Sequence, residues 1–410
     1  MPTRSTFIIY PYFSIDKPFK ARKCTTNVLN NKARCRFYAL DLGERLRHTV
    51  GMRKRILEIA ALILNNPTAP FREGLIREAI VDFCSGLGIE TRIDKLGNVI
   101  AKFQRGGNKP AIALSAHMDH PGFIIEKSTP KRLSALFYGG VEKKYFPGSK
   151  VTVYTEDGPC KTRVLSVTKA KKERALRARL SPVQCRRGDI ACWDLPSMKI
   201  KGDLLYSRAC DDLVGCVSIL ALFEKLVRRK IRANVIGLFT VAEESGLNGA
   251  KYICTQKQLG AKTPIISIET SARRPDAKIA SGVVIRVGDK QSIFSPHITT
   301  CLLETAQKLA KQNRRFKFQR KLMDGGTCEG TVYHSAGQTT GAVCICLGNY
   351  HNRNDKRTTI SPEFVSINDL ESMVELLIEI ARTGFAPLPY RKAVFRIEKG
   401  TLGQVHLLSK

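Results

Sequence analysis

From Met52 onward, the pattern of apolar and polar positions switches repeatedly between two periods. Apolar side chains recur every three or four residues in five segments, which predicts amphipathic helices at 52–66, 71–88, 211–230, 295–312 and 362–384. Short apolar runs are typical of buried strands, and they lie at 110–119, 234–244, 263–270 and 341–348. Because such strands and helices follow each other along the chain, we predict an α/β fold in which helices and a mixed sheet form three layers.

Residues 121–205 interrupt this order. Short β-prone segments such as GSKVTVYTEDG and GDIACWDLP are separated by Gly, Pro and basic turns, without a helical period. We therefore predict a small β-barrel domain inserted into an α/β domain that is discontinuous over 52–120 and 206–384. Residues 1–51 are basic and lack periodicity, which predicts a disordered extension; a transit peptide and a start site assigned too early are alternatives. Residues 385–410 are predicted to form a basic tail.

The chain of 410 residues carries a formal net charge of +32 and 13 cysteines. This charge suits nucleic acid, anionic surfaces or acidic peptides, but the basic residues are spread along the chain. The sequence has no zinc-knuckle spacing, Gly-rich phosphate loop or aromatic–basic stacking motif, which argues against nucleic acid. No apolar run approaches the roughly 20 residues that span a bilayer, so no membrane partner is expected. The odd number of cysteines without a CxxC pair favours reduced thiols in a cytoplasmic protein.

Residues with metal-binding side chains stand at the ends of the predicted strands or directly before a predicted helix. They are His117, Asp119, Asp211, Asp212, Glu243, Glu244, Glu269 and His351. In open α/β sheets, binding sites lie beyond the carboxyl ends of the strands, so we expect these side chains to converge. Two histidines and several carboxylates suit a site for two divalent ions, Zn²⁺ or a similar metal, that share a bridging carboxylate and a bridging water.

The adjacent carboxylates Glu243 and Glu244 follow the apolar run GLFTVA, where burial of two unpaired charges would be costly. A centre with two ions removes that cost and has a use for both residues. One would bind metal, and the other would stay unligated as the general base for the water. The residues by themselves leave open which of the two has which role.

Each candidate also has an ordinary structural interpretation. The pair of aspartates could cap the helix that follows it, and the first histidine could be a hydrogen-bonded structural residue. Glu269 could pair with Arg273 or Arg274, and His351 could be an exposed loop residue. The common placement of all these residues at strand ends favours the metal site.

Four motifs, HMDHPGFII, RACDDLVGC, FTVAEESGLNGA and GGTCEGTVYHSAGQTTGAVCICLGNYH, resemble the dinuclear zinc aminopeptidases of the glutamyl and tetrahedral aminopeptidase family, some of whose members are labelled endoglucanase or cellulase. The resemblance extends over about residues 52–384 with the motifs in the family's order. It implies a metallopeptidase that releases N-terminal residues from short peptides and that forms homo-oligomers, including large hollow shells. Sugar cleavage is disfavoured, because a glycosidase needs paired carboxylates along a sugar cleft and has no need of two histidines.

The resemblance also implies a role for each matching residue. Asp211 would bridge both ions and form a cis peptide bond with Asp212. His117 and Glu269 would complete the ligands of one ion, and Glu244 and His351 those of the other. Glu243 would be the general base, while Asp119 would hold the His117 ring through its far nitrogen. The ions would be Zn²⁺, with Co²⁺ or Mn²⁺ as alternatives.

Several positions depart from the family's pattern. Glu269 stands where many members have Asp, His120 where an acid is common, Leu213 where Arg is frequent, and Cys328 where an acid is expected after GGT. These differences concern substrate preference more than the metals, and a packing role is favoured for Cys328 over a reactive thiol or a metal-adjacent residue. A related deacylase or carboxypeptidase, and a non-catalytic basic binding protein on the same scaffold, are the alternatives to an aminopeptidase.

Overall fold

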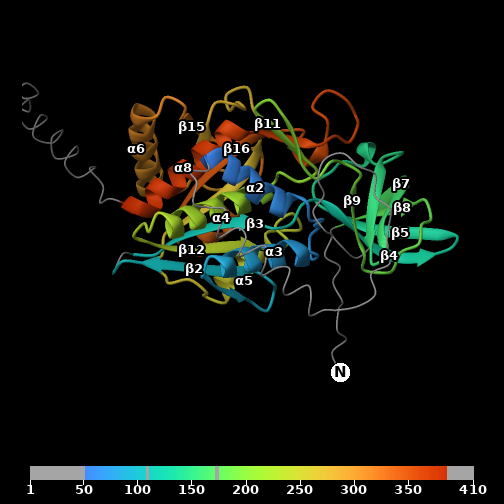
Figure 1. Cartoon of the computed structure of the whole chain (residues 1–410). Helices are drawn as coiled ribbons and strands as arrows, with labels where there is room; N and C mark the ends of the chain where they lie inside the picture. Colours follow the sequence, from blue (N-terminus) through green and yellow to red (C-terminus); the bar gives the residue numbers. More distant parts are fainter. Residues whose placement is uncertain (1–50, 108–109, 171–174, 386–410) are drawn as a thin grey trace, which may run out of the picture.

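The computed structural model describes residues 51–107, 110–170 and 175–385. The predicted N-terminal extension and C-terminal tail lie outside these residues, apart from Gly51 and Phe385. The described chain forms a helix-covered sheet on one side and a β-barrel on the other (Figure 1).

The larger part is built on a mixed sheet of 11 strands. The strands are β1 (Glu90–Ile93), β2 (Val99–Arg105), β3 (Ile112–His117), β10 (Lys199–Lys201), β11 (Leu204–Ser207), β12 (Ala233–Thr240), β13 (Ile265–Ala272), β14 (Val283–Gly288), β15 (Phe318–Leu322), β16 (Thr340–Gly348) and β17 (Glu363–Ser366). Their spatial order is β1-β2-β12-β3-β13-β16-β17-β11-β10, and β14 pairs with both β15 and β16. Strands β12, β3, β13 and β16 run parallel in the centre, where nearly every residue is buried.

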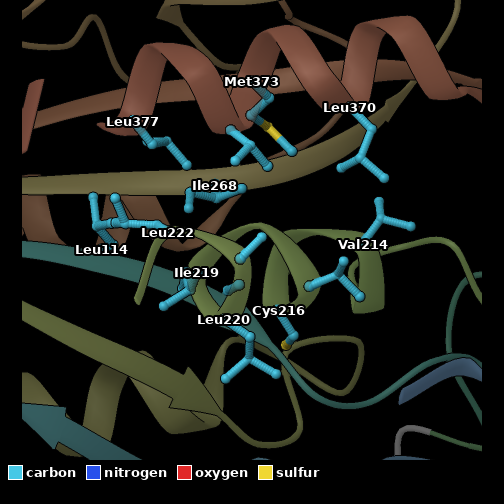
Figure 2. Packing of buried hydrophobic residues seen from close by; sticks show 14 of the residues in the cluster. Leu114, Val214, Cys216, Ile219, Leu220, Leu222, Ile268, Leu370, Met373 and Leu377 are labelled. Carbon is cyan, nitrogen blue, oxygen red and sulfur yellow. The ribbon is translucent and has the colours of Figure 1, made fainter. Parts of the chain in front are cut away.

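Helices cover both faces of this sheet. One face carries α2 (Met52–Leu64), α3 (Gly74–Gly86), α4 (Leu213–Arg228), α6 (Pro296–Gln312) and α8 (Ile367–Thr383), and the other carries α5 (Asn248–Thr255) and α7 (Glu329–Ser335). Side chains alternate along β3, so that Leu114 packs in the core under the five helices and Ala113 in the core under α5 and α7. Helix α4 is buried on almost all sides, and Figure 2 shows its Leu222 close to Leu114 of β3, with Ile268 of β13 and Met373 of α8 in the same cluster. Within the described residues, no helix is both long and apolar enough to cross a membrane.

The second part is a closed barrel. Its strands are β4 (Gly122–Thr129), β5 (Arg132–Tyr138), β6 (Lys150–Thr155), β7 (Gly158–Lys169), β8 (Leu176–Leu180) and β9 (Ile190–Trp193), in the order β4-β5-β8-β7-β6-β9. Four aromatic rings fill its core, and the Phe123 ring packs edge-on against Phe137 at 4.7 Å and Trp193 at 4.8 Å between centroids. The predicted fold, a three-layer mixed-sheet α/β domain with an inserted small barrel, is thus confirmed.

The end of the barrel insert and the start of the last helix differ from the sequence-based prediction. The last barrel strand ends at Trp193, whereas the insert was predicted to reach residue 205, because β10 and β11 pair in the large sheet next to β17. Residues 363–366, predicted as the start of a helix, form β17 itself. Short strands look alike in sequence, and the partner that decides which sheet they join lies more than 150 residues away.

Candidate metal centre

The predicted site residues meet at one edge of the large sheet. Strand β12 runs parallel to β3 with Thr240 opposite His117, and β13 runs parallel to β3 on its other side. The carboxyl ends of β3 and β12 therefore lie side by side, next to Glu269 on β13. Asp211 lies two residues before the start of α4, and His351 lies in the short helix η2 (Tyr350–Asn352) after β16. Both reach the same edge, so a site assembles from five separate segments.

Two groups of three side chains are placed to hold an ion each, and the groups share Asp211. One consists of His117, Asp211 and Glu269, the other of Asp211, Glu244 and His351, with the ligand atoms of each group within 4.8 Å of one another. Oδ1 of Asp211 lies 3.5 Å from Nε2 of His117, and Oδ2 lies 3.7 Å from Nε2 of His351. The two oxygens of one carboxylate thus face different groups, as a bridging ligand requires.

Both histidine rings are oriented by backbone carbonyls. Nδ1 of His117 faces the carbonyl oxygen of Asp119 at 3.1 Å, and Nδ1 of His351 faces that of Gly140 at 3.1 Å. A carbonyl oxygen only accepts, so each Nδ1 donates, and each Nε2 points toward the carboxylates. Burial opposes protonation of His351, but the carboxylate of Glu244, with Oε1 2.8 Å from Nε2, outweighs it and raises the pKa of His351 to about 9. The Nε2 atoms therefore lie where a positive charge is favoured.

Two buried carboxylate oxygens of these groups have no hydrogen-bond partner. They are Oδ1 of Asp211 and Oε1 of Glu269. Burial raises the pKa of Glu269 to about 8, since nearby His117 and Arg286 offset it only in part. Leaving such oxygens unpartnered is costly, and two imidazoles with three carboxylates form a donor set that suits Zn²⁺. The residues therefore fit two divalent cations, one in each group.

Glu243 belongs to neither group but lies beside both. Its Oε2 is 4.0 Å from Nε2 of His117, and its side chain is 12% exposed. Burial, together with the carboxylates of Glu269 and Glu244, raises its pKa well above the usual range in spite of His117. A buried carboxyl group next to the ligand atoms can accept and release a proton, whereas Glu244 is engaged with His351.

The segment that carries both glutamates is held by side chains from other elements. Four consecutive backbone N–H groups each donate to a side-chain oxygen. The acceptors are Asn98 for Val241 (3.0 Å), Glu73 for Ala242 (2.9 Å) and Asp119 for Glu243 and Glu244 (2.9 and 3.0 Å). The carboxylate of Asp119 thus holds the base segment, and its oxygen Oδ1 is 3.6 Å from Nδ1 of His117, farther than its own backbone carbonyl.

Asp211 and His351 are joined by the buried carboxylate of Glu363. Its Oε2 accepts the N–H groups of Cys210 and Asp211 at 2.7 and 3.0 Å, and its Oε1 accepts that of His351 at 2.8 Å. The peptide bond between Asp211 and Asp212 is cis, as the resemblance implies. Asp212 makes no side-chain capping bond to α4; its Oδ1 accepts from Thr270 at 2.8 Å, so capping does not explain the aspartate pair.

His120 links the same two segments. Its Nδ1 lies 2.7 Å from the carbonyl oxygen of Asp211, and its Nε2 lies 3.0 Å from Oδ1 of Asn352. The amide group of Asn352 donates to the carbonyl oxygen of Arg208 at 2.9 Å, so Oδ1 must be the atom that faces His120. The ring therefore lies between two hydrogen-bond acceptors, one on the Asp211 segment and one on the His351 segment.

The alternative partners considered for Glu269 are occupied elsewhere. Arg273 pairs with Asp355 at 3.0 Å, and Arg274 pairs with Asp276 and Asp324. The cation that faces Glu269 is instead Arg286 of β14, which is 3% exposed and donates to Ser271 at 3.3 Å. This buried arginine lies in an ordinary strand pattern, and nothing in the sequence signals its position.

Cys328 is a packing residue. It is 3% exposed and clusters with Phe294 and Ala342 directly before α7. Its backbone N–H donates to Oδ2 of Asp289 at 3.0 Å, and burial raises the pKa of its thiol well above the usual range. Burial of this kind is typical of a structural thiol, which favours the packing role.

Sequence reasoning missed the residues that support the ligands from behind. Glu73, Asn98, Asn352 and Glu363 are all buried polar side chains. Asn98 follows a Leu-Gly turn and Glu73 opens a helical period, so each has an ordinary local explanation in the sequence. Only their buried contacts with the segments of Ala242 and Asp211 reveal what they do.

Known proteins resemble this chain over most of its length. The model of the M42 glutamyl aminopeptidase family matches residues 97–184 and 173–376. A protein of Acetivibrio thermocellus is 28% identical over 323 residues, which cover 74% of this chain and 92% of that protein. The glutamyl aminopeptidase of Lactococcus lactis is 24% identical over 308 residues, which cover 68% of this chain and 84% of the relative.

A solved structure shows the same fold. The TET1 peptidase of Pyrococcus horikoshii superposes with a TM-score of 0.66 at 22% identity, covering 80% of this chain and 99% of that one. All eight predicted site residues lie within the segments that the family model matches. The chain therefore belongs to the M42 glutamyl aminopeptidase family, whose members hydrolyse peptides.

Proposed function

We propose that this protein is a metal-dependent aminopeptidase that removes N-terminal residues from short peptides. His117, Asp211 and Glu269 would hold one divalent cation, and Asp211, Glu244 and His351 would hold a second. The observation that carries the proposal is the position of Asp211, whose two oxygens face the two histidines. Zn²⁺ suits this set of nitrogen and oxygen donors, and Co²⁺ or Mn²⁺ would fit the same ligands.

The residues around the cations divide the chemical work. When bound, the cations lower the pKa of water and polarise the scissile carbonyl group. Glu243 takes the proton from the attacking water and returns it to the leaving amine, because it is buried beside the ligands and belongs to neither group. The carboxylate of Asp119 fixes the backbone of the general base and of the neighbouring ligand, because it accepts the N–H groups of Glu243 and Glu244.

Specificity for the end of a peptide follows from charge. The site gathers more carboxylates than two cations need, since the buried Asp119 and Asp212 and the largely buried Glu243 are added to the ligands. A free amino group of a substrate is a cation that such a site can bind, whereas a free carboxylate would be repelled. This favours an aminopeptidase over a carboxypeptidase on the same scaffold.

A homo-oligomer is part of the proposal. The TET1 peptidase of Pyrococcus horikoshii can assemble into a tetrahedron or a large octahedral shell. This chain shares its fold, including the barrel, so we propose that it also forms a closed assembly. Sedimentation of the full chain would separate a large closed particle from a monomer.

The experiment that tests the proposed function measures release of the first residue from a panel of short peptides. Wild type and Glu243→Gln would be stripped of metal, reloaded with Zn²⁺, Co²⁺ or Mn²⁺, and checked for bound metal. Glu90→Gln, which changes an exposed carboxylate on β1, is the matched control. We expect metal-dependent cleavage by wild type and by Glu90→Gln, and a loss of about 10²–10⁴ in rate for Glu243→Gln with both ions still bound.

Other results would change the assignment. Cleavage that requires a free carboxylate or an acyl group would identify a carboxypeptidase or a deacylase. A protein that binds two ions and cleaves nothing would return the chain to a binding role, for which steeply salt-dependent nucleic-acid affinity is the check. Failure to bind any divalent ion would overturn the metal centre itself.

A further inference from the structure

Phe71 has an unusual backbone and an unusual exposure. It lies in the loop between α2 and α3 with φ of +69°, in the left-handed region that bulky residues avoid. Its side chain is large and apolar, yet the residue is 45% exposed. Residues held in this region are over-determined by their surroundings, and they cluster at functional sites.

The surroundings of Phe71 explain how the conformation is held. Its N–H donates to Oε1 of Glu73 at 2.8 Å, and its carbonyl oxygen accepts from the guanidinium of Arg72 at 3.0 Å. The same guanidinium also donates to the carbonyl oxygen of Gly188, just before the last barrel strand, at 3.2 Å. Both backbone polar groups of Phe71 are therefore engaged, and the ring is left at the surface.

Glu73 connects Phe71 to the segment of the general base. The oxygen that accepts the N–H of Phe71 also accepts the N–H of Ala242 at 2.9 Å. Ala242 directly precedes Glu243 and is itself left-handed, with φ of +51°. Two residues in the same rare conformation are thus tied together by one buried oxygen, which places the Phe71 backbone beside the start of the base segment.

Tyr138 connects Phe71 to the opposite side of the site. The two rings are in edge-to-face contact, with centroids 5.2 Å apart and planes at 80°. Tyr138 ends β5, and two residues later the carbonyl oxygen of Gly140 faces Nδ1 of His351 at 3.1 Å. Gly140 lies so close to the His351 ring that a Cβ there would be 3.2 Å from Nδ1. The aromatic pair therefore lies between two segments of the site: Phe71 is linked to Ala242 through Glu73, and Tyr138 is followed closely in the chain by Gly140.

We propose that Phe71, supported by Tyr138, forms an apolar wall that contacts the side chain of the substrate's N-terminal residue, and that the enzyme prefers large apolar residues there. The proposal rests on the proposed aminopeptidase function and names its substrate class. A half-exposed aromatic side chain beside a site gains from covering by an apolar group.

Phe71→Gly is the variant that tests this role, because glycine adopts a positive φ without strain and removes only the ring. Rates would be measured on Phe-, Leu-, Ala- and Glu-p-nitroanilide, with kcat and KM determined separately, alongside melting temperature and bound metal. Lys230→Gly is the matched control, since Lys230 is exposed and also left-handed (φ +50°). Lys230 follows the C-terminal end of α4, whereas the N-terminal end of this 16-residue helix lies next to the site, so Lys230 is remote from the site.

We expect wild type to favour Phe and Leu over Ala and Glu. Phe71→Gly should lower kcat/KM on Phe and Leu by about tenfold, leave Ala nearly unchanged, and keep the melting temperature and metal content of wild type. Phe71→Leu should restore most of the preference, and Lys230→Gly should change none of the ratios.

Three results would overturn the inference. An equal loss on all four substrates would show that Phe71 acts on the site in general, and unchanged ratios would show that its ring does not contact the substrate. A change confined to the size of the assembly would make Phe71 a contact between subunits. If wild type cleaves none of the peptides or anilides, the proposed function fails as well, whereas a wild type that cleaves them with unaltered ratios in Phe71→Gly refutes the wall alone.

Discussion

The carboxylate of Glu363 accepts the backbone N–H of His351 with one oxygen at 2.8 Å, and its other oxygen accepts the N–H of Asp211 at 3.0 Å. Two proposed ligands from segments 140 positions apart in the chain are thus fixed to one buried side chain. Residues that orient ligands in this way commonly change metal affinity by about 10–100-fold when they are replaced.

Glu363→Gln should therefore weaken metal binding. The amide of glutamine would bring its NH₂ group against a backbone N–H, so one of the two connections would be lost. We expect the affinity for Zn²⁺, measured by competition with a chromophoric chelator, to fall by about tenfold or more. Glu304→Gln, on the exposed side of α6, should leave it unchanged. Equal affinities for the two variants would contradict the role of Glu363.

Asp119→Asn separates two roles of this carboxylate. If its main effect is to hold the N–H groups of Glu243 and Glu244, the variant should lose about 10–100-fold in kcat while still binding two ions. If it acts chiefly on His117, metal affinity should fall instead. Because the backbone carbonyl of Asp119 already faces Nδ1 of His117, we expect the first result. Metal titration and steady-state kinetics on one preparation decide between them.

Removal of metal should lower stability. Without metal, the unpartnered oxygens of Asp211 and Glu269 would stay buried beside other carboxylates. A ligand that binds only the folded state adds about 4 kcal/mol to the free energy of unfolding when its free concentration is about a thousand times its Kd. We expect the melting temperature to drop after chelation and to recover with Zn²⁺, but less with Mg²⁺, which prefers all-oxygen octahedral sites. A melting temperature that is the same with and without Zn²⁺ would speak against the centre.

Gly215→Ala should disturb the site without touching a proposed ligand. A Cβ at this position in the first turn of α4 would overlap the carboxylate of Asp212, which is fixed by Thr270. Overpacking of this kind costs about 1–3 kcal/mol, and we expect activity to fall with it. Gly86→Ala in α3 is the control, since a Cβ there meets no atom and should be neutral or stabilising. Similar thermal unfolding of both variants would contradict the predicted overlap.

Glu73 should make stability depend on pH. Burial and the nearby Asp119 raise the pKa of Glu73 to about 8, although three N–H groups partly oppose this. The folded state therefore holds the proton more tightly than the unfolded state, and the stability present at low pH is lost as the pH rises through about 8. Between pH 6 and 9, we expect the free energy of unfolding to fall less in Glu73→Gln, which stays neutral, than in wild type. Parallel pH profiles in urea unfolding would refute this.

Several features of the site could be predicted from the chain alone. Four candidate ligands each stand where an apolar run ends or a helix begins: His117, Asp211, Glu244 and His351. Their side chains are of types that bind metals, so position and side-chain chemistry both predicted a metal site. The choice between Glu243 and Glu244 could not be made from the residues without the family resemblance. Here the structure adds a contact of 2.8 Å between Glu244 and His351, which leaves Glu243 outside both groups.

The supporting residues could not be predicted, because what they do depends on distant backbone atoms. Glu73 is an ordinary acid at the start of a helix until the fold brings its oxygen against the N–H groups of Phe71 and Ala242. The same holds for β10 and β11, which resemble barrel strands until they pair next to β17.

The sequence by itself determined the layered α/β plan, the presence of a barrel insert and the candidate metal ligands, because periodicity and side-chain chemistry are local properties. Only the tertiary structure decided that Asp211 faces both histidines, that Glu363 joins their segments and that Phe71 is held exposed beside the base. These relationships depend on distances between segments far apart in the chain, which are set by how the strands pair and the helices pack.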